Sequence, residues 1–292
     1  MQEAIEKAAV LIEALPYIQS FHEQVFVIKL GGSAMKDEPS LLSTLTDIVF
    51  LNQVGIHPVV VNGGGAAITE AMARSGLTPR FVAGHRFTDE KTLAIVEEVL
   101  VNQVNADIVR KIIALGSWAE GLHRKNGNVL LAEKYWLEDP SGNRVDPGFV
   151  GKVVRVDAPY IQRVALSGHI PVIAPIASGV DAHAYNCNAD NAACKVAEAL
   201  SAQKLVFLSD VPGILTKEGD PSSRVSSAAR QEIERLIASR TIQGGMLPKV
   251  KEALEGISRG VKKVHIIDGR LPHSLLLEIF TKEGIGTEIT GA

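Results

Sequence analysis

Short apolar runs alternate with longer amphipathic stretches along most of this chain. The runs that we predict to be strands cover residues 25–30, 58–61, 170–176, 205–208 and 263–267. The stretches with helical spacing cover residues 41–54, 66–75, 90–115, 189–202, 226–239 and 248–259. Several of the predicted strands are apolar throughout, which is typical of strands that are covered on both faces. The alternation predicts an α/β fold with a mainly parallel sheet between layers of helices.

Two segments depart from this alternation. At the start of the chain, Ile5, Ile12 and Leu15 recur at helical spacing, and we expect Pro16 to end this amphipathic helix. Between residues 121 and 156, turn signals such as Asn126-Gly127 separate short β-like pieces, which predicts inserted β-hairpins that form a lid over a substrate. We therefore divide the chain into an N-terminal helix and link (1–24), a first lobe (25–180) and a second lobe (181–292).

The composition limits the kinds of partner. The 292 residues are 46% hydrophobic with a net charge of only -3, so no broad positive field exists to attract nucleic acid or an anionic membrane. No uncharged apolar run is long enough to span a bilayer, and acidic residues interrupt the first segment, unlike in a signal peptide. Cys187 and Cys194 are too few for a disulfide framework. We expect a soluble, cytoplasmic protein.

A lysine and two glycines mark the end of the first predicted strand. Lys29 lies inside an apolar run that leads directly into Gly31 and Gly32. Burying an ammonium group is costly unless an anion receives it, and the two glycines let backbone N–H groups approach an oxyanion closely. This pattern favours a phosphoryl site. The alternative is a lysine that reaches solvent above an ordinary turn.

A second glycine run follows the next strand. Gly63, Gly64 and Gly65 open the helix predicted from Ala66, and a helix N-terminus behind glycines is a natural anion site. The alternative is a tight turn that needs positive φ. No Gly-Lys-Ser/Thr follows, and the spacing of G-x-G-x-x-G is missing, so P-loop and simple Rossmann interpretations weaken.

Two polar clusters come later in the chain. Asn186, Asn188 and Asp190 precede a helix, where they either cap it or bind a substrate and nearby lysines. The strand at 207–215 ends in a polar turn that contains Ser209, Asp210 and Gly213. These residues either line a nucleotide pocket or are present only because the turn itself favours them.

Lys249 is the last of these signals. It falls in the first turn of a predicted helix, an end where cations are disfavoured unless an anion compensates them. An exposed lysine with no role is the alternative. The chain has no His-Glu-x-x-His, and its two cysteines lack zinc spacing, so we predict no metal held by protein side chains alone.

Taken in order, six motifs resemble those of the amino acid kinase family, in the arrangement of its acetylglutamate kinases. They are VIKLGGS, NGGGAAI, GHRFTD, NCNAD, FLSDVPGIL and GGMLPKV. The resemblance runs from about Val25 to the end of the chain. It implies an open αβα sandwich and transfer of the γ-phosphoryl group of ATP to the side-chain carboxylate of N-acetyl-L-glutamate, with Mg²⁺ held mainly by phosphate oxygens. The first lobe is then expected to bind the acyl amino acid and the second lobe ATP.

The resemblance also assigns residues. It implies that Lys29 and Lys249 stabilise the transferred phosphoryl group, that Asp190 holds both lysines, and that Gly31, Gly32 and Gly64 donate backbone N–H groups. Residues expected to bind the acyl amino acid are Gly64, Gly65, Arg86 and Asn186. Residues expected to contact ATP are Ser209, Asp210, Val211, Pro212, Gly213, Ile214, Leu215, Thr241, Ile242 and Gln243.

Three residues depart from the family pattern. Asn62 stands where His is usual, Ala66 where Pro is common and His85 where an aliphatic residue is usual. All three fall in the expected acyl amino acid lobe. A kinase for an aminoadipate-type or other acidic substrate, or a catalytically silent amino acid sensor, therefore stays open as an alternative.

The extra N-terminal helix resembles that of the arginine-inhibited members, in which such helices join dimers into a hexamer. His265, Glu278 and Gly284 match the positions that surround arginine in those enzymes. We therefore expect a homohexamer or homodimer in which arginine is a feedback effector and Glu278 pairs with its guanidinium group.

Overall fold

The computed structural model describes the whole chain except residues 33–34, 36, 139–141, 218 and 292. Ser33 of the first glycine motif therefore lies outside the described residues. The helical elements are α1 (Gln2–Phe21), α2 (Glu38–Gln53), α3 (Gly65–Arg74), α4 (Glu90–Glu97), the π-helical η1 (Glu98–Asn105), α5 (Ala106–Ala114), α6 (Ala158–Leu166), α7 (Ala189–Ala199), the 3₁₀ turn η2 (Pro221–Ser223), α8 (Arg230–Ala238), α9 (Met246–Ser258) and α10 (Ser274–Ile279).

The strands fall into a large central sheet and a small inserted region. Those of the central sheet are β1 (Val25–Leu30), β2 (His57–Asn62), β5 (Trp118–Leu122), β10 (His169–Ile173), β13 (Lys204–Ser209), β14 (Ser227–Ala229), β15 (Lys263–Asp268) and β16 (Thr287–Thr290). The others are β3 (Phe81–Val82), β4 (His85–Arg86), β6 (Leu130–Lys134), β7 (Leu137–Glu138), β8 (Arg144–Val145), β9 (Val150–Val156), β11 (Ile176–Gly179) and β12 (Ala184–Cys187).

The central sheet has the order β14-β16-β15-β13-β1-β2-β10-β5. Every neighbouring pair is parallel except β15 and β16. The prediction of a mainly parallel sheet is therefore confirmed. Strands from the first part of the chain join those from the second part where β1 pairs with β13, so one sheet runs through the whole fold.

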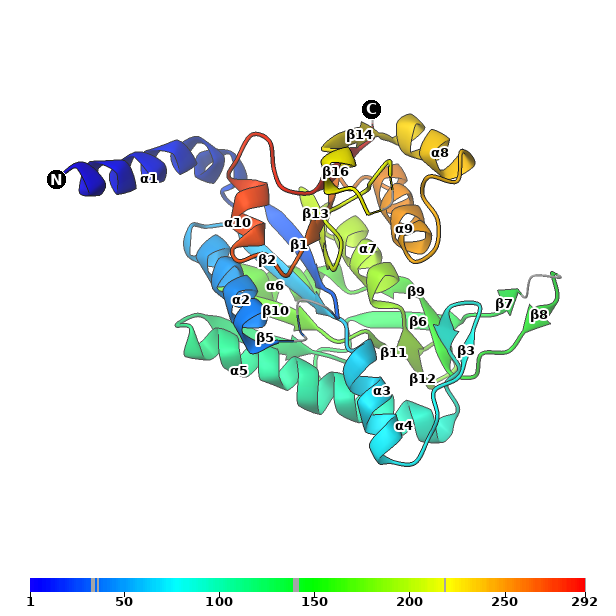
Figure 1. The fold of residues 1–292 in the computed structure, drawn as a ribbon. Helices are drawn as coiled ribbons and strands as arrows, with labels where there is room; N and C mark the ends of the chain where they lie inside the picture. Colours follow the sequence, from blue (N-terminus) through cyan, green and yellow to red (C-terminus); the bar gives the residue numbers. More distant parts are fainter. Residues whose placement is uncertain (33–34, 36, 139–141, 218, 292) are drawn as a thin grey trace.

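Helices cover both faces of this sheet, and β1 shows how the sequence distributes them. Alternate side chains of a strand point to opposite faces. Phe26 and Ile28 pack with the apolar side chains of α2, α5 and α10, whereas Val27 packs with those of α6, α7 and α9. Figure 1 shows α2 and α10 on one side of β1 and α7 and α9 on the other. Lys29 shares the face of Val27 and is directed toward the α7 side.

The region between 121 and 156 contains the predicted hairpins. Strands β6 and β9 pair antiparallel, and together with β11 and β12 they form a small closed barrel. The short hairpin of β7 and β8 extends from the end of this barrel, at the right of Figure 1.

Three predicted boundaries were wrong. Pro16 does not end the first helix, because α1 continues to Phe21. Proline removes one backbone hydrogen bond, and on this exposed helix water can reach the carbonyl left free. Beyond the proline, Tyr17 packs edge-on against Phe280 and Phe21 against Phe26, which holds the end of α1 on the body of the protein.

The other two errors lie at sheet strands. Residues 227–229 form β14 at the sheet edge, so the helix predicted from Ser226 begins only at Arg230. The strand predicted as 170–176 is broken, because β10 ends at Ile173 and β11 begins at Ile176. Among the described residues, no helix is both long and apolar enough to cross a membrane.

Candidate functional site

Two lysines from distant parts of the chain meet at one carboxylate. The ammonium nitrogen of Lys29 lies 2.9 Å from Oδ1 of Asp190, and that of Lys249 lies 2.8 Å from Oδ2. Lys29 comes from β1, Asp190 from the first turn of α7 and Lys249 from the first turns of α9. All three side chains are less than one-fifth exposed. The carboxylate therefore holds two cations side by side within a partly buried region.

The charges of this cluster are mutually dependent. Burial alone raises the pKa of Asp190, but attraction to Lys29 and Lys249 outweighs it and lowers the pKa to about 2. Burial lowers the pKa of Lys249, and the attraction of Asp190 opposes that change only in part. Asp190 is therefore ionised at neutral pH.

The N-terminus of α7 explains how Asp190 comes to face the lysines. Asn188 is the N-cap, and its side chain accepts hydrogen bonds from the backbone N–H groups of Asp190 and Asn191. Because Asn188 provides the cap, the Asp190 side chain is available to the two lysines, and the helix dipole favours negative charge in the first turn. Of the three polar residues in this cluster, only Asn188 is the cap, whereas Asn186 lies on β12.

Gly31 lies where two strand ends approach closely. A Cβ atom at this position would lie 2.2 Å from the carbonyl oxygen of Leu208, the end of the neighbouring strand β13. A side chain would therefore push the strands apart. Gly31 and Gly32 line a cavity of about 190 Å³ together with both lysines, Ser209 and Asp210.

The second glycine run is not the positive-φ turn that we considered. Gly64 has an extended φ of 171°, and neither Gly63 nor Gly65 has a positive φ in the left-handed region. The need for glycine is spatial, because a Cβ atom on Gly64 would lie 2.4 Å from Cδ2 of Leu100 in η1. The run leads into α3, whose N-terminal N–H groups lie at this turn.

A cavity of about 300 Å³ brings together all four residues predicted to bind the acyl amino acid. Its lining includes Lys29, the glycines Gly63–Gly65, Arg86, Asn186 and Asp190. Asn186 donates a 3.3 Å hydrogen bond from its amide to the hydroxyl oxygen of Thr88.

Arg86 is the conspicuous charge in this cavity. Its guanidinium donates to the carbonyl oxygen of Gly65 at 3.0 Å and to the hydroxyl oxygen of Thr69 at 2.7 Å. The residue is only 9% exposed, and burial lowers its pKa. No carboxylate of the described residues lies within 4.0 Å of its nitrogen atoms. A carboxylate ligand would meet a positive charge that is already held in position by neutral groups.

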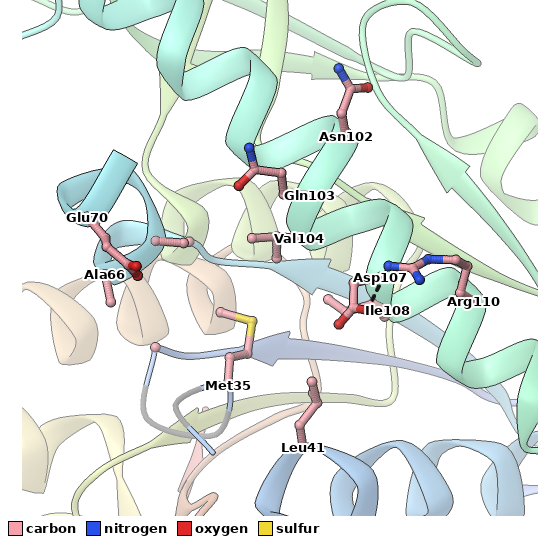
Figure 2. A pocket seen from close by; sticks show the side chains of 13 residues that line it. Met35, Leu41, Ala66, Glu70, Asn102, Gln103, Val104, Asp107, Ile108 and Arg110 are labelled. Carbon is pink, nitrogen blue, oxygen red and sulfur yellow. Dashed lines mark hydrogen bonds and ion pairs between the residues drawn. The ribbon is translucent and has the colours of Figure 1, made fainter. Parts of the chain in front are cut away.

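A larger cavity of about 630 Å³ lies on the other side of the rim that the two glycine runs form, and Figure 2 shows its side chains. Gly32 and Gly64 belong to the lining of both this cavity and the 300 Å³ one. The lining of the larger cavity contains neither Lys29 nor Lys249. The single cation among the described residues of its lining, Arg110, is paired with Asp107 at 2.9 Å. The two lysines therefore act on one side of the rim.

The residues predicted to contact ATP are only partly brought together. Ser209 and Asp210 line the 190 Å³ cavity beside the lysines, but that lining does not extend to residues 211–215 or 241–243. The side chains of Ile214 and Ile242 are buried in the core. The backbone N–H group of Ile214 donates to the hydroxyl oxygen of Thr287. Any contact of these two isoleucines with a nucleotide would involve their backbone.

The three residues predicted to surround arginine all line a separate cavity of about 630 Å³. Nδ1 of His265 lies 2.6 Å from Oε1 of Glu278, and Oε2 of Glu278 accepts from the backbone N–H groups of Ile285 and Gly286. A Cβ atom on Gly284, whose φ is positive, would lie 2.7 Å from the same carboxylate. Burial raises the pKa of Glu278, but these hydrogen bonds lower it more strongly.

Lys204 lines this cavity too, and our sequence analysis missed it. It is the first residue of β13, is 5% exposed, and its ammonium nitrogen lies 2.9 Å from Nε2 of His265. Burial lowers its pKa to about 8. The sequence contained a signal for it, because Lys204 directly precedes the apolar run 205–208, much as Lys29 lies within an apolar run.

With this geometry established, known proteins can be compared. The sequence pattern of the amino acid kinase family matches residues 24–268. The acetylglutamate kinase of Pelotomaculum thermopropionicum is 47% identical over 288 residues, which are 97% of this chain and 98% of that protein. The acetylglutamate kinase of Aquifex aeolicus is 48% identical over 301 aligned positions, covering 99% of each chain.

The chain belongs to the amino acid kinase family, among the acetylglutamate kinases. Solved structures agree with this family. An N-acetylglutamate synthase from Neisseria gonorrhoeae, in complex with coenzyme A and N-acetyl-glutamate, superposes with a TM-score of 0.85 at 25% identity. The match covers 98% of this chain but only 63% of the synthase chain. A carbamate kinase from Giardia lamblia shares the amino acid kinase fold at 17% identity and a TM-score of 0.62.

The depressed pKa of Asp190 generates a prediction about acid stability. A carboxyl group whose pKa is lower in the folded than in the unfolded state stabilises the fold above the unfolded pKa, and this contribution is lost as the pH falls through the folded pKa. Asp190 should therefore contribute about 2 kcal/mol at neutral pH that disappears between about pH 4 and pH 2. Urea unfolding of the wild type and of Asp190→Asn across this range measures the difference. Identical acid profiles for the two proteins would contradict this assignment.

Proposed function

We propose that this member of the amino acid kinase family transfers the γ-phosphoryl group of ATP to the side-chain carboxylate of N-acetyl-L-glutamate. The products are N-acetyl-L-glutamyl 5-phosphate and ADP, an early step toward arginine. The observation that carries the proposal is the convergence of Lys29 and Lys249 on Asp190, at the junction of the 300 Å³ and 190 Å³ cavities. The same lobes are then the acyl amino acid lobe (25–180) and the ATP lobe (181–292).

The chemistry needs charge neutralisation more than proton transfer. A carboxylic acid with a pKa of about 4.3 is already ionised at neutral pH, so the nucleophile requires no general base. The barrier comes from bringing an anionic oxygen to an anionic phosphoryl group. Lys29 and Lys249 would neutralise the charge that gathers there, and Asp190 holds both ammonium groups in place. Backbone N–H groups of Gly31, Gly32 and Gly64 would donate to the same group.

The 300 Å³ cavity supports an acidic acyl amino acid as the acceptor. Arg86 offers a guanidinium group that Gly65 and Thr69 hold in position, and a substrate carboxylate would bind it in bidentate fashion by replacing part of these hydrogen bonds. Asn186 lies in the same lining and is assigned to the backbone end of the substrate, with Gly64 and Gly65 at its border.

ATP is assigned to the second lobe. Its terminal phosphates would occupy the 190 Å³ cavity beside Ser209 and Asp210, and the rest would lie along Val211–Leu215 and Thr241–Gln243. Mg²⁺ fits this donor set as an ion held mainly by phosphate oxygens, because the carboxylate of Asp190 is already neutralised by two lysines and no group of three His, Cys, Asp or Glu among the described residues could hold a metal ion. When bound, it would neutralise part of the phosphate charge. The proposal includes a cytoplasmic location, in keeping with two free cysteines.

The direct test is an ADP-release assay with purified protein and MgATP. N-acetyl-L-glutamate, L-glutamate, N-acetyl-L-aspartate and N-acetyl-L-2-aminoadipate are supplied side by side. We expect the highest kcat/KM with N-acetyl-L-glutamate. A preference for the aminoadipate derivative would replace the substrate and keep the reaction, whereas no ADP release with any acid would favour a silent sensor and contradict the proposal.

Removing either lysine should impair the chemical step. We expect Lys29→Ala and Lys249→Ala each to lower kcat by about 10²-fold or more with smaller changes in KM, because the charge they stabilise develops in the transition state. Steady-state kinetics with both substrates measures the effect. A matched control is Lys251→Ala, which removes an exposed lysine from the same helix. Normal turnover in Lys29→Ala would remove that lysine from the mechanism.

We also propose that arginine inhibits this enzyme by binding in the 630 Å³ cavity lined by His265, Glu278 and Gly284. Its guanidinium group would pair with Glu278, and Lys204 offers a cation for its carboxylate. Binding of L-arginine to a related synthase is consistent with this proposal.

Arginine inhibition gives a prediction with a matched control. We expect L-arginine in the millimolar range to lower the rate of the wild type and to act on Glu278→Gln only at concentrations about 10-fold higher or more, because the buried ion pair is lost. Glu283→Gln, which makes the same charge change at an exposed position of the same cavity, should keep normal sensitivity. Wild-type activity that is indifferent to arginine would end the proposal.

We assign the contact between copies of the chain to α1. This helix extends away from the body of the protein (Figure 1), and its exposed apolar side chains include Ile5, Leu11, Ile12 and Leu15. Ile12 alone is 68% exposed. We propose that a second copy of the chain buries this surface, giving the homohexamer in which α1 joins homodimers.

Charging the surface of α1 should break this contact. We expect Ile12→Glu to reduce the assembly to dimers, because a buried carboxylate without a partner is costly. Gln19→Glu places the same charge at an exposed polar position of the helix and should leave the assembly intact. Sedimentation velocity separates the two states, and an unchanged sedimentation coefficient for Ile12→Glu would place the interface elsewhere.

A further inference from the structure

Two buried amide side chains lie directly beneath the second glycine run. Asn62 is fully buried and Asn105 is 2% exposed. Nδ2 of Asn105 donates to Oδ1 of Asn62 at 2.9 Å and to the carbonyl oxygen of Val172 at 2.8 Å. Nδ2 of Asn62 in turn donates to the carbonyl oxygen of Gly63 at 3.1 Å. A continuous chain of hydrogen bonds therefore leads from η1 to the backbone of the glycine run.

This chain of bonds controls the orientation of one peptide group. The carbonyl of Gly63 and the N–H of Gly64 belong to the same planar trans peptide, so they point in opposite directions. Fixing the carbonyl with Asn62 therefore fixes the direction of the Gly64 N–H group. On the other side, the N–H group of Gly63 donates to the carbonyl oxygen of Leu30 at 2.9 Å, which ties the run to β1 next to Lys29.

The π-helical geometry of η1 lets one segment support the run at two points. Leu100 packs so closely on Gly64 that a Cβ atom there would lie 2.4 Å from Cδ2 of Leu100. Leu100 and Asn105 are five residues apart. Hydrogen bonds of a π-helix join residues five apart, which brings their side chains to one face, whereas in an α-helix residues at this spacing diverge. One turn of η1 can therefore place an apolar contact and an amide donor under the same loop.

We propose that Asn105 is a positioning residue for phosphoryl transfer, which acts through Asn62 to aim the Gly64 N–H group at the transferred phosphoryl group. The proposal rests on the assignment of Gly64 made under the proposed function. Asn105 itself touches no substrate, because it lies below the run and not in the lining of the 300 Å³ cavity. This role requires an amide at position 62, because the side chain there must both accept a hydrogen bond from Asn105 and donate one to the carbonyl oxygen of Gly63.

The test separates positioning from stability. Asn105→Leu leaves the buried Asn62 oxygen without its donor and should both destabilise the protein and lower kcat. In Asn62→Leu/Asn105→Leu, both amides of the pair are replaced by apolar groups of similar size. This removes the cost of the unpaired Asn62 oxygen, although the Val172 carbonyl also loses a donor, so part of the stability should return. We expect kcat of this double variant to stay at least about 10-fold below wild type with KM values within about twofold, because the Gly63 carbonyl is no longer held.

Asn102→Leu is the matched control. Asn102 lies on the same η1 segment but is exposed, donates a hydrogen bond to Glu98 and points away from Val104 in Figure 2. It should retain wild-type kinetics and stability. If the double variant recovers kcat together with its stability, the amide pair has only a structural role and the proposal is overturned.

A second measurement does not depend on the substrate. Hydrogen exchange of the free protein, followed at the peptide that contains Gly63–Gly65, reports whether the run is held. We expect exchange at the Gly63 amide, which donates to the carbonyl oxygen of Leu30, to rise about 10-fold or more in Asn62→Leu/Asn105→Leu, with exchange in α7 unchanged. Unchanged exchange at Gly63 would overturn the proposal even if the enzyme phosphorylates N-acetyl-L-glutamate. If the wild type phosphorylates none of the acids, the proposed function fails separately, and the exchange result still decides whether Asn105 holds the run.

Discussion

The carboxylate of Asp190 between two ammonium groups is the contact on which the candidate site depends. Two cations held this close in a partly buried region repel each other strongly, since the local dielectric screens them less than water does. Asp190 compensates both charges at once, at 2.9 Å and 2.8 Å. It also links β1, α7 and α9, so one side chain fixes the relative position of three elements that are remote in the sequence.

The layered architecture determines which side chains can reach that carboxylate. Lys29 shares the face of Val27, and the helices packed on that face include both α7 and α9. The carboxyl ends of β1 and β2 lie next to each other in the parallel sheet, so the glycine runs that follow them form a single rim. Ligands of open parallel sheets bind at such strand ends for the same reason. The glycines permit this crowding, as the close approach of Gly31 to the Leu208 carbonyl demonstrates.

Strand β13 connects this site to the second cluster of buried charges. Its first residue, Lys204, contacts His265 in the cavity assigned to arginine, and its last residue, Ser209, lines the cavity beside Lys29 and Lys249. The strand is buried along its whole length between β1 and β15. A rigid element thus contacts both sites, which gives an effect of one on the other a direct physical route.

The sequence by itself determined the alternation of strands and helices, the mainly parallel sheet and the residue types of the candidate site, but it did not reveal β5, β14 and β16 of that sheet. Periodicity and glycine placement depend on local chemistry, and β1 was predicted with its observed limits. Only the tertiary structure decided the features that depend on contacts between distant segments. It showed that Asn188 and not Asn186 caps α7, that Gly64 is required for space and not for a positive φ, and that Pro16 lies inside α1. The partners in these cases, such as Leu100 below Gly64 and Phe280 beside Tyr17, are far away in the sequence, and packing between distant segments leaves no local pattern to read.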